Sequence, residues 1–173
     1  MFLPKNHYSN LAEYDSSGGA GGFTNVEYGL MAELLGRSRT AAEATNCAAP
    51  DTGNMEVIAR YGTAEQKAKW LRPLLNGEIR SGYLMTEPDK ASSDGRNISL
   101  SIKQEGDTLV LNGSKWWSSG AGDERCKIYI VMGKDMNVKE GEEGYGRQSM
   151  VLVPSDSAGL TVHRMLSVYG YDE

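Results

Sequence analysis

The chain has 173 residues, of which 39% are hydrophobic and 24% charged, and its formal net charge at pH 7 is −5. This composition is typical of a globular protein rather than a disordered or fibrous one, and the length allows one domain or two small ones. The mildly negative charge is spread along the chain and argues against nucleic-acid binding, which usually needs a basic patch. No apolar run reaches the roughly 18–20 residues of a membrane span.

The cysteines and histidines give no sign of a disulfide framework or a metal centre. Cys47 and Cys126 form no CxxC pair, so we interpret both as small buried residues in a reducing compartment. His7 and His163 are too few and too far apart to indicate a zinc site. Free thiols suit the mitochondrion, the peroxisome and the cytoplasm alike, so the sequence leaves the intracellular compartment open.

The first part of the chain shows helical periodicity. A cap at Thr24 or Asn25 and a stop at Gly36 predict a helix whose apolar residues recur at helical spacing. Residues 48–54 are rich in turn-forming side chains, and we interpret them as a connection. A short helix is expected to follow and to end near Gly62.

The next expected helix begins at Thr63, which matches the capping-box pattern with Gln66 three residues later. Pro73 should kink this helix or restart its last turn, and Gly77 should end it. Its buried stripe is expected to consist of Trp70, Leu71, Leu74 and Leu75. A stripe of tryptophan and leucine at this spacing indicates core packing rather than cofactor contact.

From about residue 79 the pattern changes to short strands and turns. Strands are expected at residues 79–85, 98–103, 108–111, 127–132, 149–153 and 160–162. Residues 105–107 are expected to form a turn, and Asn112-Gly113 predicts a hairpin-type turn. The polar residues 134–147 are interpreted as a solvent loop. Helices followed by antiparallel strands predict an α+β protein with a sandwich or barrel in its second part. Residues 165–169 point toward a further strand, so we expect an incomplete domain with an open edge.

Two segments could carry chemistry, residues 83–94 and residues 115–121. The first runs from a strand into a turn with several hydroxyl groups, and the second places Trp116 and Trp117 beside two serines. Together they could offer a flat ligand a stacking face and hydrogen-bond donors. The structural alternative is a strand end with a turn, and two tryptophans on the two faces of a strand.

The amino-acid sequence of these segments resembles the paired flavin motifs of the acyl-CoA dehydrogenases. Residues 85–88 read Met-Thr-Glu-Pro, residues 92–94 read Ser-Ser-Asp, and residues 115–120 read Lys-Trp-Trp-Ser-Ser-Gly. Further runs, at residues 49–57 and 61–79, resemble the long-chain branch that includes the animal family members ten and eleven. The resemblance implies a partial N-terminal helical domain at residues 1–78 and an incomplete antiparallel middle β domain at residues 79–173, without the C-terminal helical bundle.

The resemblance also assigns roles to single residues. It implies FAD contacts for Tyr83, Leu84, Met85, Thr86, Trp117, Ser118 and Ser119, and contacts with the CoA side of the substrate for Ser92 and Ser93. Thr86 matches a threonine at the flavin ring, and Trp117 matches a tryptophan packed against it. Ser119 replaces a threonine that hydrogen-bonds near the flavin N5. Basic residues such as Lys115 are expected to be solvated.

The implied reaction is the α,β-dehydrogenation of a fatty acyl-CoA, as in fatty acid β-oxidation. A glutamate removes the α-proton while a hydride leaves the β-carbon for the flavin N5. In the family that glutamate lies in the C-terminal bundle, so no residue here matches it, and Glu87 takes a structural role. The implied partners are the acyl-CoA substrate, electron-transfer flavoprotein as electron acceptor, and further copies of the chain in a homo-oligomer.

On this interpretation the chain alone is truncated, binds FAD weakly and turns over nothing. Two alternatives stay open. One is an acyl-CoA oxidase-like flavoenzyme, distinguished by a fast reaction of the reduced flavin with oxygen. The other is a non-catalytic module that associates with further subunits through an exposed apolar surface.

Overall fold

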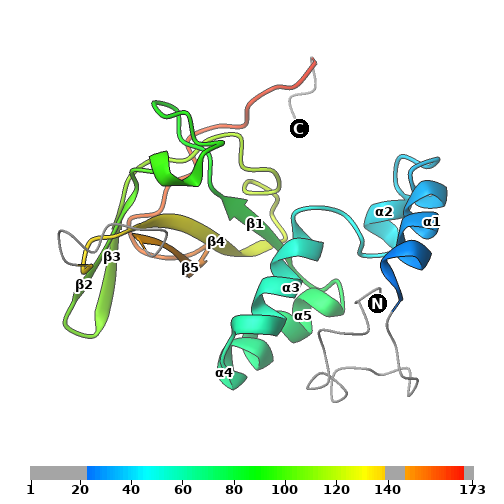
Figure 1. The fold of residues 1–173 in the computed structure, drawn as a ribbon, viewed down its shortest axis with the longest axis horizontal. Helices are drawn as coiled ribbons and strands as arrows, with labels where there is room; N and C mark the ends of the chain where they lie inside the picture. Colours follow the sequence, from blue (N-terminus) through cyan, green and yellow to red (C-terminus); the bar gives the residue numbers. More distant parts are fainter. Residues whose placement is uncertain (1–22, 139–146, 170–173) are drawn as a thin grey trace. The chain divides into compact units, whose positions relative to one another are not determined.

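The computed structural model describes residues 23–138 and 147–169. The chain divides into two compact units with the boundary between Arg80 and Ser81. Helices make up the first unit and a five-stranded open sheet makes up the second (Figure 1), so the predicted α+β class is confirmed. Within the described ranges no helix is long and apolar enough to cross a membrane, and no cluster of potential ligands could hold a metal ion. His7 lies outside these ranges.

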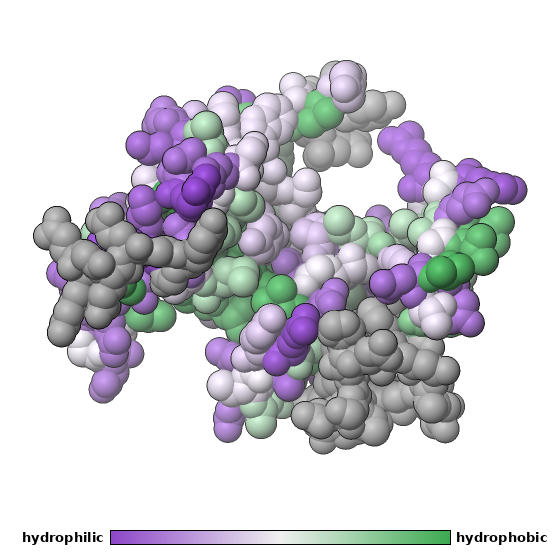
Figure 2. Space-filling view, viewed as in Figure 1, coloured by the Kyte–Doolittle hydropathy of each residue, from purple (hydrophilic) through white to green (hydrophobic). Residues whose placement is uncertain are grey.

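The first helix, α1 (Asn25–Leu35), begins and ends where its capping residues predict. Thr24 and Glu27 form a reciprocal capping box, and Gly36 follows the last turn. No residue of this helix is buried: Figure 2 shows hydrophobic side chains over α1, and Leu30 and Leu34 are each 61% exposed. Local capping is therefore sufficient to define α1, although its apolar stripe is not packed.

The helix α3 (Asp51–Tyr61) begins earlier than expected, so the interpretation of residues 48–54 as a connection is wrong. Tertiary packing explains the difference, because Asp51 and Asn54 are buried together with Met55 and Ile58. Burial on this scale outweighs the turn preference of the individual residues. The predicted end at Gly62 is confirmed. A short helix, α2 (Ala41–Ala44), precedes α3.

The helix expected from Thr63 forms as three consecutive segments. They are α4 (Ala64–Gln66), the π-helical η2 (Lys67–Leu71) and α5 (Arg72–Leu75). The capping box of Thr63 and Gln66 is confirmed, and the restart before Pro73 fits a residue that cannot donate a backbone hydrogen bond. After α5 the Gly77 amide bonds to Leu74 and the Glu78 amide bonds to Pro73, which is a Schellman ending with Gly77 at φ +71°.

The expected stripe of this helix is buried in its central part. Leu71 and Leu74 are fully buried, whereas Trp70 and Leu75 are half-buried. The ammonium group of Lys69 lies 4.7 Å from the centre of the Trp70 ring. Trp70 therefore has a structural environment in the helical unit, as the spacing predicted.

The second unit contains β1 (Arg80–Leu84) from Ser81 on, η3 (Gly95–Asn97), β2 (Ser101–Glu105), β3 (Thr108–Asn112), β4 (Cys126–Asp135) and β5 (Gln148–Pro154). The sheet order is β1-β4-β2-β3, and β5 also pairs with β4. The pairs β2–β3 and β4–β5 are antiparallel as expected, but β2 and β4 are parallel. The parallel pair arises because residues 113–125 cross over between β3 and β4 instead of turning back.

Two details of the predicted strands are wrong. The expected turn at residues 105–107 is confirmed and closes the β2–β3 hairpin, with Gly106 at φ +61°, but Asn112-Gly113 leads into the crossover and not into a hairpin turn. A Cβ atom at Gly113 would lie 2.9 Å from Leu100, so this glycine serves a close approach and not a hairpin. Residues 160–162 form no strand, although Leu160 packs against the core. Of the expected loop at 134–147, residues 139–146 lie outside the described part of the chain.

One hydrophobic cluster in the core of the sheet unit consists of Leu100, Ile102, Cys126, Tyr129 and Val131, and Ile98, Ile128 and Ile130 are also buried in this unit. Both cysteines are free thiols, and Cys126 is buried in this core while Cys47 is half-buried in the helical unit. The residues of this cluster lie in β2 and β4 or directly before β2. Leu100, the first of them, follows soon after the turn that carries the first motif.

Candidate functional site

The two motif segments lie side by side in the sheet unit. The Trp116 amide donates a hydrogen bond of 3.0 Å to the Thr86 carbonyl. The Lys115 ammonium group donates a hydrogen bond of 2.8 Å to the Met85 carbonyl. The fold therefore joins the end of β1 to the start of the second motif, which stands about thirty positions later in the chain.

A buried ion pair lies beneath this junction. Lys115 Nζ is 2.9 Å from Glu87 Oε1, and the two side chains are only 5% and 4% exposed. Glu87 Oε1 also accepts a bond from the Leu100 amide, while Oε2 accepts bonds from the amide and hydroxyl of Ser99. The expectation that Lys115 is solvated is therefore wrong, because its ammonium group is enclosed and bonded to a carboxylate and a carbonyl.

The surroundings of this pair determine its protonation. Burial opposes ionisation of Glu87, but hydrogen bonds from Ser99, Leu100 and Lys115 outweigh it and lower the pKa of Glu87 to about 2. Burial lowers the pKa of Lys115, and its bond to Glu87 opposes that shift. A carboxylate with so low a pKa and four donors is a poor proton acceptor near neutral pH.

Several side chains of the two motifs are exposed, and they are aromatic or carry a hydroxyl group. Thr86 and Ser119 are exposed, and the rings of Trp116 and Trp117 are 40% and 51% exposed, with centroids 6.1 Å apart. Trp117 has φ +51°, a left-handed backbone conformation that is unfavourable for a bulky residue. The alternative of two tryptophans on a regular strand is therefore wrong. Exposed aromatic rings on a strained backbone are a frequent property of ligand sites.

Among the other predicted flavin contacts, Tyr83 and Leu84 lie on opposite faces of β1, whereas Met85 and Ser118 lie outside the strand. Leu84 packs against the core, whereas the Tyr83 hydroxyl lies 3.7 Å from the sulfur atoms of Met132 and Met150. Alternation along the strand explains this separation, and burial raises the pKa of Tyr83. Met85 is half-buried, and the Ser118 hydroxyl donates to the Trp116 carbonyl over 3.4 Å. Their contacts with FAD stay predictions.

The two serines expected to contact substrate have different environments. Ser92 is buried; its hydroxyl accepts a 2.9 Å bond from the Glu87 amide and donates a 3.0 Å bond to the Lys90 carbonyl. Ser93 is exposed. The Ser92 hydroxyl thus closes the turn after the first motif. Contacts of either serine with CoA stay predictions.

Sequence reasoning missed Tyr129, which holds the second motif from its other end. Its hydroxyl donates a 2.6 Å bond to the Ala121 carbonyl, and burial, reinforced by Cys126, raises the pKa of Tyr129 to about 12. The Tyr129 ring lies against Gly82, where a Cβ atom would approach it to 2.9 Å. Strand alternation could have marked Tyr129 as a core residue, but no local signal pairs it with Ala121.

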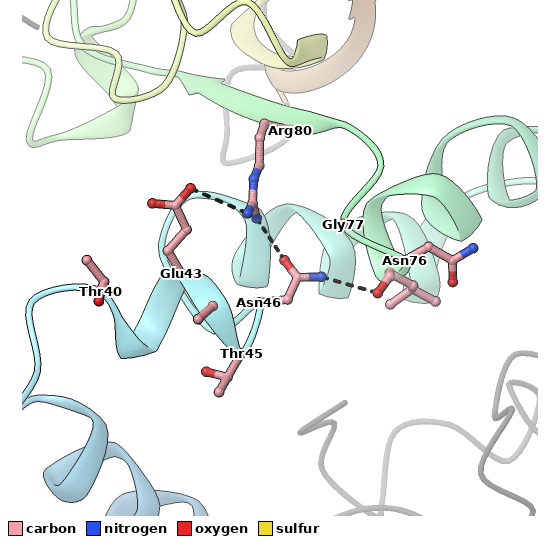
Figure 3. A pocket seen from close by; sticks show the side chains of 9 residues that line it. Thr40, Glu43, Thr45, Asn46, Asn76, Gly77 and Arg80 are labelled. Carbon is pink, nitrogen blue, oxygen red and sulfur yellow. Dashed lines mark hydrogen bonds and ion pairs between the residues drawn. The ribbon is translucent and has the colours of Figure 1, made fainter.

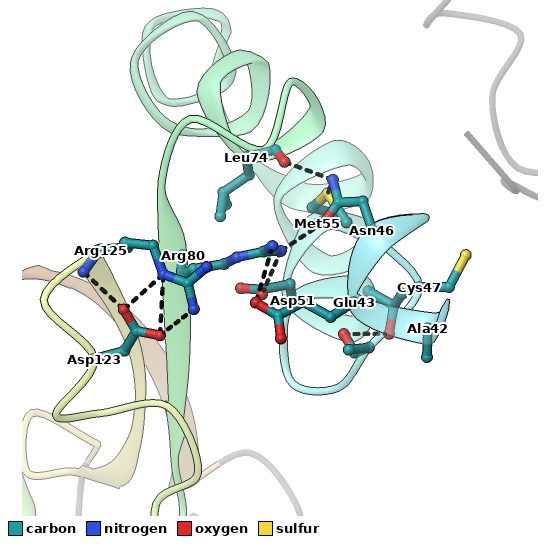
Figure 4. Close-up of polar contacts among 12 residues, drawn as sticks. Ala42, Glu43, Asn46, Cys47, Asp51, Met55, Leu74, Arg80, Asp123 and Arg125 are labelled. Carbon is teal, nitrogen blue, oxygen red and sulfur yellow. Dashed lines mark hydrogen bonds and ion pairs between the residues drawn. The ribbon is translucent and has the colours of Figure 1, made fainter. Parts of the chain in front are cut away.

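The helical unit contains a polar pocket of about 590 Å³ around Arg80 (Figure 3). Arg80 lies 3.1 Å from the Asn46 side-chain oxygen and 3.4 Å from the Asp51 carboxylate, and it also reaches Glu43. Asn46 in turn donates a 2.8 Å bond to the Leu74 carbonyl (Figure 4). Because Arg80 is engaged by three side chains, this network is best explained as a structural link between α2, α3 and the end of α5.

Comparison with known families assigns both parts of the chain. Residues 11–78 match the N-terminal domain of acyl-CoA dehydrogenases, and residues 82–173 match their middle domain. The chain is 55% identical over 152 residues to acyl-CoA dehydrogenase family member 10 of Mus musculus, covering 88% of this chain and 14% of that protein. The resemblance to the branch with members ten and eleven is therefore confirmed.

Two solved structures extend the comparison. One, from Mycobacterium abscessus and assigned to the acyl-CoA dehydrogenases, is 51% identical with a TM-score of 0.83, over 94% of this chain and 39% of that chain. A glutaryl-CoA dehydrogenase from Mycobacterium smegmatis in complex with FADH2 is 29% identical with a TM-score of 0.52, over 66% of this chain and 27% of that one. The chain thus spans between 14% and 39% of the length of these proteins. From its domains and these relatives, the chain belongs to the acyl-CoA dehydrogenase family.

Proposed function

We propose that this chain forms part of the FAD site of an acyl-CoA dehydrogenase, with the flavin ring against the surface of Thr86, Trp117 and Ser119. The observation that carries the proposal is the hydrogen bond from the Trp116 amide to the Thr86 carbonyl. It joins the two motif segments while the aromatic rings stay exposed. The FADH2 bound to the related glutaryl-CoA dehydrogenase supports the choice of cofactor.

The side chains of this surface suit a flavin. The Trp117 ring offers a stacking face, and the hydroxyl groups of Thr86 and Ser119 can donate to the polar edge of a heteroaromatic ring. When bound, FAD would accept the hydride that leaves the β-carbon of a fatty acyl-CoA thioester. The role of these residues is to hold the ring in place and to bond to its edge.

Proton removal from the substrate requires a base that this surface does not supply. Glu87 is the acid nearest in sequence to Thr86, but its carboxylate accepts four hydrogen bonds and its pKa is about 2. We therefore place the catalytic base elsewhere in the complete enzyme and expect no turnover by this chain alone. The acyl-CoA substrate, its contacts with Ser92 and Ser93, and electron-transfer flavoprotein as acceptor are parts of the same proposal.

A calorimetric FAD titration tests the binding function. Trp117→Leu should weaken FAD binding about fivefold, because the loss of one aromatic stack costs on the order of 1 kcal/mol. The matched variant Trp70→Leu changes the same residue type in the helical unit and should bind FAD as the unmodified chain does. Equal weakening by both variants, or no FAD binding at all, would contradict the proposal.

A second assay tests the missing base. The chain is incubated with FAD, a long-chain acyl-CoA and an artificial electron acceptor, and reduction of the acceptor is followed over time. We expect no turnover above the rate with free FAD. Sustained reduction would show that a base within this chain acts on the substrate, and would contradict that part of the proposal.

A further inference from the structure

We propose that the buried pair of Glu87 and Lys115 is the positioning device of the flavin surface. It fixes the first motif against the second and so sets where Thr86 and Trp117 face the ring. This inference rests on the proposed function and deepens it. It gives a role to two side chains that would not themselves touch the cofactor.

The contacts around Thr86 show how the positioning works. Lys115 bonds to the Met85 carbonyl at 2.8 Å and to the Glu87 carboxylate at 2.9 Å, so it holds the residue on each side of Thr86. Trp116 bonds to the carbonyl of Thr86 itself. Three consecutive residues of the first motif are thus held by two consecutive residues of the second, which leaves the Thr86 backbone little freedom.

Glu87 connects this junction to the rigid part of the unit. Its other bonds come from Ser99 and from the amide of Leu100, a residue of the hydrophobic core. Ser92 also bonds to the Glu87 amide and fixes the backbone at the same point. The pair therefore fixes the two motif segments relative to the core. It does so through charged hydrogen bonds, which are stronger than neutral ones.

The backbone conformation of Trp117 depends on this positioning. Its left-handed conformation, φ +51°, persists only where the neighbouring residues over-determine it. Lys115 and Trp116 hold the chain directly before this residue, and the bond from Tyr129 to Ala121 holds it after. The second motif is thus tethered on both sides of the ring that is proposed to stack on the flavin.

A double variant separates positioning from simple stability. Glu87→Gln with Lys115→Met removes both charges together and avoids leaving one buried ion unpaired. The matched control is Lys103→Met with Glu105→Gln, an exposed lysine–glutamate pair in β2 of the same unit. Each variant is measured by its amide circular dichroism, its affinity for FAD, and the circular dichroism that the protein induces in the visible bands of the flavin.

We expect the buried double variant to stay folded, to bind FAD about tenfold more weakly or worse, and to lose the induced flavin signal, because misplacement of the ring contacts is costly. The exposed double variant should match the unmodified chain in all three measurements. A folded buried variant with unchanged affinity and flavin signal would overturn the positioning role and leave the proposed function intact. No FAD binding by the unmodified chain would overturn both.

The conservative variant Lys115→Arg provides a second test of the positioning role, and this test does not require the double variant to fold. It keeps the positive charge but changes the donor geometry at Met85 and Glu87. Folded Lys115→Arg protein with weaker FAD binding and a reduced flavin signal supports positioning. If it folds and binds FAD as the unmodified chain does, the geometry of the pair does not matter and the proposal is wrong.

Discussion

Two lysine–glutamate pairs in the sheet unit have nearly the same length and different surroundings. Lys115 and Glu87 are 2.9 Å apart and almost fully buried, whereas Lys103 and Glu105 are 2.8 Å apart and more than half exposed. The bond to Glu105 raises the pKa of Lys103, but burial lowers the pKa of Lys115 in spite of Glu87. Identical chemistry thus gives opposite shifts, and the surroundings of a pair decide what it contributes.

The difference has a structural consequence. The buried pair joins segments 28 positions apart and has additional donors at its carboxylate, so each partner depends on the other. The exposed pair spans two positions of one strand, and water can replace either partner. Only the buried pair is expected to govern both stability and the shape of the flavin surface.

The largest effect should come from breaking the buried pair on one side. Lys115→Met leaves the buried carboxylate of Glu87 without its cation, and should lower the free energy of unfolding by about 3–5 kcal/mol. Urea denaturation measures this change. A loss below about 1 kcal/mol, in the range of exposed pairs, would show that the pair is not structurally important.

Acid should remove the stabilisation that the buried pair contributes. The pKa of Glu87 is lowered from 4.5 to about 2, so its stabilisation is complete above pH 4.5 and is lost as the pH falls toward 2. The shift corresponds to about 3 kcal/mol of unfolding free energy. Urea denaturation from about pH 6 to about pH 2 should show this dependence, and Glu87→Gln should reduce it.

The hydrogen bond from Tyr129 to Ala121 should contribute less to the unfolding free energy than the buried ion pair does. Tyr129→Phe removes the bond to the Ala121 carbonyl and leaves that half-buried carbonyl without its donor. We expect a loss of about 1–2 kcal/mol in unfolding free energy, together with weaker FAD binding. If stability falls while FAD affinity is unchanged, the loop after Ser119 is held for the fold alone.

The strained residue should separate stability from function. Trp117→Gly removes a half-exposed ring and relieves the left-handed backbone, so the unfolding free energy should stay within about 1 kcal/mol of the original or rise. FAD binding should weaken at least as much as in Trp117→Leu, because the same aromatic stack is lost. A strongly destabilised variant with unchanged FAD affinity would show that the ring packs for structure.

The smallest effect is expected at the exposed pair. Lys103→Met should change the unfolding free energy by less than about 0.5 kcal/mol, and added salt should make the effect smaller still. The same urea measurement serves as the reference for Lys115→Met. Equal losses at both sites would remove the distinction between the two pairs.

The sequence predicted those features of the fold that depend on neighbouring residues. The cap expected at Thr24 or Asn25, which is Thr24, the capping box at Thr63 and the ends at Gly36 and Gly62 depend on local hydrogen bonds, and all of them are confirmed. The start of α3 was missed because it depends on burial of Asp51, which no local pattern reveals. The β2–β4 parallel pair was missed for the same reason.

The candidate site divides in a similar way. The motifs identified the segments around Thr86 and Trp117, and the structure brings those segments together. Lys115 was expected in solvent, since a lysine beside a turn is usually exposed and its two acceptors lie far away in the chain. The support beneath the surface depends on tertiary contacts, so it could not be inferred from spacing.

The most direct test of the account follows the tryptophan signals while FAD is added. The chain has three tryptophans, and their indole N–H resonances can be assigned with single Trp→Phe variants. Progressive shifts of the Trp116 and Trp117 signals, with the Trp70 signal unchanged, are the predicted result even if binding is weak. Shifts confined to Trp70, or no shift of any indole signal at saturating FAD, would contradict a flavin site formed by these two motifs.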